Sequence, residues 1–152
     1  MLYCETTGIE PYYALTTIKR FADGGEVRRT SRAIVDGLVA LGHTTSSIAT
    51  LSEYALDHGH LADAPGLRDE QRRVFQTAAG PGALSPTAHL RMVAAVQPLL
   101  SGGVSRTVPL PTDTDGDAIE DIFIAAWRLG LKAIAVYRER SRIAQPLTAD
   151  ED

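Results

Sequence analysis

The end of the chain, residues 85–147, constrains the fold most, because its pattern reads helix, strand, helix, strand. Ser85 precedes a proline and is typical of a helix start. Residues 104–110 and 132–137 are rich in β-branched and apolar side chains, which favour strands. A second helix, capped at Asp117, lies between them. Since a strand–helix–strand unit is a crossover, we expect the two strands to be parallel.

Elsewhere the pattern favours helices, and the expected class is a helix-rich α/β fold. Before residue 85 we expect a hairpin with arms at 12–21 and 26–29, and helices at about 31–41, 47–58 and 68–77. The second of these helices is expected to be capped near Ser46 or Ser47. In the last helix an apolar stripe is predicted to be core; it consists of Ile119, Ile122, Phe123, Ala126 and Trp127.

Composition excludes several classes of protein. With 152 residues, 44% of them hydrophobic, the chain fits one domain over residues 1–147 with an acidic tail at 148–152. A net charge of −4 argues against a nucleic-acid polymer as partner. We expect no membrane span and no signal peptide. The single cysteine, Cys4, cannot form a disulfide within the chain, so a reducing cytoplasm is the expected location.

Six segments carry a family resemblance. They are CETTGIEP at 4–11, FADGG at 21–25, VDGLVALGH at 35–43, HG and APGL at 58–59 and 64–67, HLRMVAAVQPLLSGGVSRTVPLP at 89–111 and AWRLGLKAIAVYRERSRIAQPL at 126–147. In order and spacing they resemble the C-terminal part of the catalytic subunit of adenosylcobalamin-dependent (class II) ribonucleotide reductase. The resemblance covers nearly the whole chain and implies part of an α/β barrel.

The resemblance also implies a chemistry. The family reduces nucleotides through a thiyl radical, two further cysteines supply electrons, and cobalamin generates the radical; all these parts correspond to sequence upstream of this chain. One cysteine cannot supply three thiols, so we expect no nucleotide reduction by this chain alone. Adenosylcobalamin is expected only when a partner completes the barrel, and no cofactor is expected on this chain by itself.

Three positions depart from the family's usual residues. Pro109 stands for asparagine, Gln76 for aspartate, and Arg140 for a glycine. The cysteine pair that ends the family's chains is also absent. These departures keep a repurposed function open.

Candidate site residues follow from the same segments. Glu10 and Cys4 are candidates for catalytic roles, and the substrate-binding candidates are Gly8, Glu10, Ser105, Arg106 and Thr107. For Glu10 the alternative is a charged turn residue, and for Cys4 a small apolar one. For Ser105, Arg106 and Thr107 the alternative is a strand end that faces water.

No metal site is predicted. The four histidines, His43, His58, His60 and His89, are interpreted as loop and cap residues. Asp113, Asp115 and Asp117 lack the glycine and glutamate spacing of a calcium loop and are interpreted as a solvated turn.

Three functions remain open, and whether the chain is an enzyme is left undecided. In the first, the chain is the C-terminal part of a split reductase, with a larger reductase-like chain as partner. Alternatively it is a repurposed biosynthetic enzyme, for example a cyclase, which would form a homo-oligomer around a small-molecule pocket. The third function is a non-catalytic binding or regulatory fragment.

Overall fold

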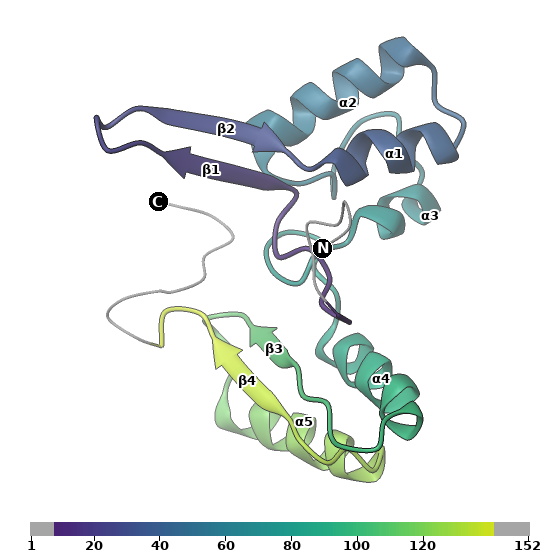
Figure 1. Cartoon of the computed structure of the whole chain (residues 1–152), viewed down its shortest axis with the longest axis vertical. Helices are drawn as coiled ribbons and strands as arrows, with labels where there is room; N and C mark the ends of the chain where they lie inside the picture. Colours follow the sequence, from purple (N-terminus) through teal and green to yellow (C-terminus); the bar gives the residue numbers. More distant parts are fainter. Residues whose placement is uncertain (1–7, 142–152) are drawn as a thin grey trace. The chain divides into compact units, whose positions relative to one another are not determined.

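The computed structural model describes residues 8–141, which fall into two compact units. Unit 1 comprises residues 12–83, and unit 2 comprises residues 8–11 together with 84–141. Figure 1 shows the elements of both units along the chain. The two units lie within the region that the sequence predicts to be one domain, and each is described by itself.

Unit 1 is a β-hairpin followed by helices. Its elements are β1 (Thr16–Arg20), β2 (Glu26–Thr30), α1 (Arg32–Ala40), α2 (Thr45–His58), α3 (Asp69–Arg72) and the 3₁₀ turn η1 (Arg73–Phe75). The strands are antiparallel, with Thr16 opposite Thr30 and Arg20 opposite Glu26, as the sequence predicts. Gly24, at φ 86°, makes the turn between them because that backbone conformation favours glycine.

Side-chain caps fix the ends of the two longer helices of unit 1. The Ser31 hydroxyl accepts a hydrogen bond from the Ala33 N–H at 3.1 Å and starts α1 at the predicted place. In α2 the cap is Thr44, whose hydroxyl accepts from Ser47 N–H at 3.3 Å. The predicted start of α2 at Ser46 or Ser47 was therefore two or three residues late. Gly59, at φ 76°, ends α2 as predicted.

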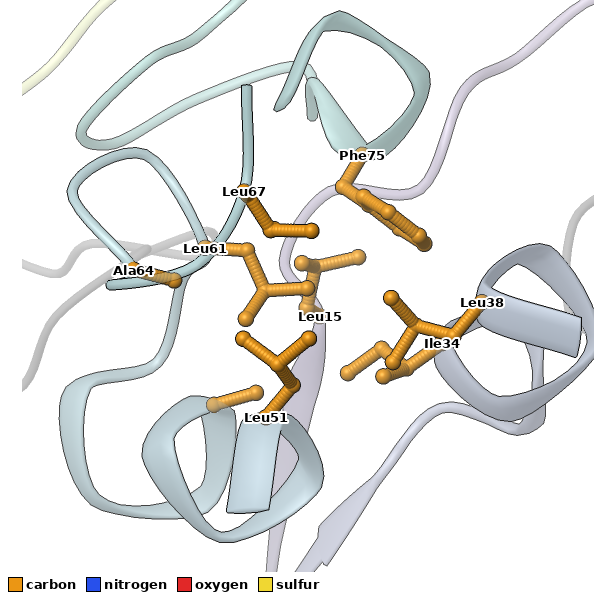
Figure 2. Packing of buried hydrophobic residues seen from close by; sticks show 9 residues of the cluster. Leu15, Ile34, Leu38, Leu51, Leu61, Ala64, Leu67 and Phe75 are labelled. Atoms are coloured by element: carbon orange, nitrogen blue, oxygen red, sulfur yellow. The ribbon is translucent and has the colours of Figure 1, made fainter. Parts of the chain in front are cut away.

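The core of unit 1 is apolar and is formed by α1, α2, η1 and the segments that precede β1 and follow α2 (Figure 2). Its buried members are Leu15, Ile34, Leu38, Leu51, Ala55, Leu61, Ala64, Leu67 and Phe75. Phe75 packs against Gly37 in the middle of α1: a Cβ atom at Gly37 would lie 2.7 Å from Cε1 of Phe75. The glycine that weakens the helix is thus required for close packing of the ring.

Unit 2 contains the predicted crossover. Its elements are α4 (Pro86–Val96), the 3₁₀ turn η2 (Gln97–Leu99), β3 (Thr107–Leu110), α5 (Gly116–Arg128) and β4 (Ala135–Arg138). β3 and β4 pair in parallel, with Thr107 opposite Ala135, so the prediction of two parallel strands joined through the tryptophan-bearing helix is confirmed. Val108 and Leu110 are buried with Leu90 and Ala126 in the core of this unit.

Two details of α5 differ from the prediction. The cap is Asp115, whose carboxylate accepts from Ala118 N–H at 2.8 Å, rather than Asp117, because the helix already begins at Gly116. Phe123 and Trp127 were predicted to be core but are 45% and 78% exposed. The stripe is wider than the surface that α4 and the strands cover within the unit, so only its Ala126 side is buried.

Among residues 8–141, no helix has the length and apolar character needed to cross a membrane.

Candidate functional site

The candidate site of unit 2 forms where β3 begins and segment 8–11 passes beside it. Arg106 immediately precedes β3, and its side chain is 2% exposed. Glu10 belongs to the segment, and its side chain is 46% exposed. Both residues were predicted as site candidates, each from a different segment of the sequence. The structure brings them together although most of the chain lies between them.

Arg106 holds the segment by two contacts. Its Nη1 donates a hydrogen bond to the backbone carbonyl of Ile9 at 3.2 Å. Its Nε lies 3.2 Å from Oε2 of Glu10, an ion pair in which the N–H is not aligned well enough to count as a hydrogen bond. Among residues 8–141, neither Nε nor Nη2 of this guanidinium has a hydrogen-bond partner.

Burial is the main influence on the pKa of Arg106. Burial lowers the pKa of the guanidinium, and the carboxylate of Glu10 partly offsets this effect. An arginine remains charged at neutral pH under such a shift. The cluster therefore contains one buried positive charge, and a half-exposed carboxylate is its counter-ion.

His89 adds a second buried polar side chain to this cluster. It lies in α4 and is fully buried. Its pKa is lowered from 6.5 to about 4, first by burial and then by the positive charge of Arg106, and the Leu84 backbone partly offsets both effects. That backbone contact is weak, because neither ring nitrogen has a hydrogen bond of ordinary geometry among the described residues. His89 is therefore a neutral imidazole at pH 7.

The neutral state of His89 predicts a pH dependence of stability. Between pH 6.5 and 4 the unfolded chain binds a proton at His89 and the folded chain does not, so the unfolding free energy falls as the pH falls through this window. We expect a loss on the order of 2 kcal/mol. Urea titrations at pH 7 and pH 4.5 measure it, and His89→Met should flatten the slope. An equal slope in that variant would assign the effect to other groups.

Sequence reasoning missed His89 by placing it in a cap. Its spacing gives the signal that could have found it, because His89, Leu90 and Val93 share the buried side of one helix. The other three histidines agree better with the interpretation as loop and cap residues. His58 lies at the end of α2, His60 accepts a hydrogen bond from Ala62 N–H in a loop, and His43 lies within hydrogen-bond distance of Ser47 and Gln71.

The remaining predicted residues do not converge on Arg106. Ser105 and Thr107 are exposed, because side chains alternate along the strand and Arg106 points inward. Gly8 is exposed in a turn at φ 59°. Cys4 lies outside the described residues. Among residues 8–141, no group of three or more His, Cys, Asp or Glu side chains is placed to hold a metal ion.

This arrangement can orient a carboxylate. A buried guanidinium fixes both the backbone and the side chain of one short segment, and the carboxylate that it positions still reaches the surface. Residues 8–141 contain no cysteine, so this part of the chain offers no thiol beside the carboxylate.

Proteins of one family match this chain over nearly its whole length. The family model "Ribonucleotide reductase, barrel domain" matches residues 1–137. A vitamin B12-dependent ribonucleotide reductase of Streptantibioticus cattleyicolor is 40% identical over 149 residues, which are 98% of this chain and 25% of that protein. One of Rhodopirellula baltica is 40% identical over 156 residues, which cover all of this chain and 15% of that protein.

A solved structure shares the fold. The class Id ribonucleotide reductase alpha subunit of Actinobacillus ureae superposes with a TM-score of 0.61 at 20% identity, over 86% of this chain and 22% of that one. The chain thus spans a quarter or less of the length of these relatives.

Proposed function

The chain belongs to the ribonucleotide reductase barrel-domain family, and we propose that it forms the C-terminal part of a cobalamin-dependent reductase barrel whose remainder is a longer polypeptide. The observation that carries the proposal is the parallel β3–β4 pair. Parallel strands are stable in sheets whose faces and edges are covered. Within residues 8–141 this sheet has two strands, and no further strand of that part of the chain pairs with the outer edge of either. Further strands of a partner would complete this sheet.

Within that barrel we assign Arg106 and Glu10 a positioning role. The guanidinium holds segment 8–11 against the start of β3, and the segment presents Glu10 at the surface. By the resemblance, this segment lies beside the substrate region of the family. Glu10 would there face a polar part of the nucleotide, and Gly8, Ser105 and Thr107 remain weaker candidates for contacts with it.

The partner would supply the chemistry that this chain lacks. Adenosylcobalamin, when bound by the completed enzyme, supplies the radical; the one cysteine of this chain cannot also supply the reducing pair. The chain alone would therefore hold and orient substrate without reducing it. A reducing cytoplasm suits such an assembly.

A complementation assay tests the proposal. The Streptantibioticus cattleyicolor reductase, with the segment matching this chain deleted, is first checked for folding by circular dichroism. It is then assayed for ribonucleotide reduction with adenosylcobalamin and a dithiol, with and without this chain. We expect deoxynucleotide only from the mixture. Turnover by this chain alone, or an inactive mixture of folded proteins, would overturn the proposal, and Cys4→Ala tests whether its thiol takes part.

A further inference from the structure

Four large apolar side chains lie exposed at one end of unit 2. They are Leu99, Leu100, Trp127 and Leu129, with exposed fractions of 82%, 42%, 78% and 41%. We call this set the helix-end patch. Single exposed apolar residues are common on proteins, but a group that includes a tryptophan at one place is typical of an interaction surface.

Hydrogen bonds hold the patch together at the carboxyl ends of α4 and α5. The Gln97 side chain donates from Nε2 to the Gly130 carbonyl at 2.8 Å, and its Oε1 accepts from Lys132 N–H at 2.8 Å. Lys132 also donates from Nζ to the Gly102 carbonyl at 3.1 Å. Leu99 and Leu100 follow Gln97 directly, and Trp127 and Leu129 precede Gly130, so these bonds fix both pairs at the same end.

Charge near the patch is of one sign. Arg128 and Lys132 are exposed beside it, and residues 97–104 and 127–132 contain no acidic side chain. The acidic residues of α5 belong to its first turns. A second copy docking patch to patch would bring these cations against their own equivalents, which is unfavourable, whereas a partner with an acidic rim would be attracted.

We propose that the helix-end patch is the docking surface for the longer reductase polypeptide, through an apolar area with an acidic rim. The proposal rests on the function proposed above. Its second support is length: three quarters of the Streptantibioticus cattleyicolor reductase has no counterpart in this chain, so a large protein surface is available to cover the patch. Trp127 would be its central anchor, since tryptophan dominates the binding energy of many interfaces.

Trp127 is also the only tryptophan of the chain, so its fluorescence reports on this surface alone. In the isolated 152-residue chain we expect emission and acrylamide quenching typical of a water-exposed indole. Adding the segment-deleted Streptantibioticus cattleyicolor reductase, with the tryptophans of that probe replaced by phenylalanine, should shift the emission to the blue and reduce quenching.

Variants measure how much the patch contributes. Leu99→Ser keeps the fluorescent probe and should weaken binding at least tenfold, which is about 1.4 kcal/mol. Val39→Ser is the matched control, because Val39 is a 60% exposed apolar residue of α1 in unit 1. It should leave the affinity unchanged.

The outcomes separate this inference from the proposed function. If the two proteins bind without a change in Trp127 emission, or if Leu99→Ser binds with unchanged affinity, the helix-end patch is not the docking surface. The proposed reductase assembly would still stand. Shielding that grows with the concentration of the chain alone would assign the patch to a second copy, and shielding at every dilution would assign it to the chain's own residues; either result overturns the inference. Failure to bind together with an inactive mixture would remove the proposed function itself.

Discussion

Replacing Glu10 by alanine is expected to lower the unfolding free energy by about 2 kcal/mol. The variant leaves the guanidinium of Arg106 buried, charged and without its carboxylate, and removing one partner of a buried ion pair costs about 3–5 kcal/mol. We place the loss below that range because the Glu10 side chain is 46% exposed and water already screens it. Urea unfolding followed by circular dichroism at pH 7 measures the change.

Two further variants identify the cause. Arg106→Met removes the buried charge together with its unpaired nitrogens, so the double variant of Glu10 and Arg106 should be more stable than Glu10→Ala alone. Asp36→Ala is the matched control: its carboxylate lies 3.3 Å from Arg32 Nε, a similar distance, but both side chains are more than half exposed. We expect it to cost less than about 0.5 kcal/mol. Equal losses in the two pairs would show that burial of Arg106 does not govern the effect.

Gly37→Leu is expected to destabilise unit 1 by about 3 kcal/mol, although leucine is the better helix former. Even a Cβ atom at this position would lie 2.7 Å from Cε1 and 3.1 Å from Cζ of Phe75. The ring is 7% exposed and packed into the core, so it cannot turn aside without opening that core. The change is measured as the shift in the urea midpoint.

The matched control is the glycine at the start of α5. A Cβ atom on Gly116 meets nothing within 4 Å, so Gly116→Leu should be neutral or slightly stabilising. Phe75→Ala removes the obstructing ring and leaves a cavity that a leucine at position 37 can partly fill. The double variant should therefore lose less stability than the sum of its two single changes, and strict additivity would refute the steric explanation.

Local chemistry accounts for what could be predicted of the fold. Ser31, Ser85 and Gly59 set helix ends through interactions within a few residues, and each lies where the sequence places it. The parallel pairing of β3 and β4 follows from the helix between them. The start of α5 was misplaced because several aspartates precede it, and any of them satisfies the capping pattern.

What the sequence could not reveal depends on contacts between distant residues. Arg106 and Glu10 each stand in a suggestive segment, but only the folded chain shows that one is the counter-ion of the other. The exposure of Trp127 was equally hidden, since an apolar stripe does not tell which of its members a neighbour covers. The roles of Gly8, Ser105, Thr107 and Cys4 stay predictions.

The contact of Arg106 with Ile9 and Glu10 has a consequence for synthesis on the ribosome. Unit 2 consists of segment 8–11 and residues 84–141, so unit 1 is an insertion within it in the sequence. During translation unit 1 can fold as soon as it leaves the ribosome, but segment 8–11 cannot pack until residues 84–141 have been synthesised. A folded insertion also draws its own two ends closer than a loose loop would, which reduces the entropic cost of that delayed closure.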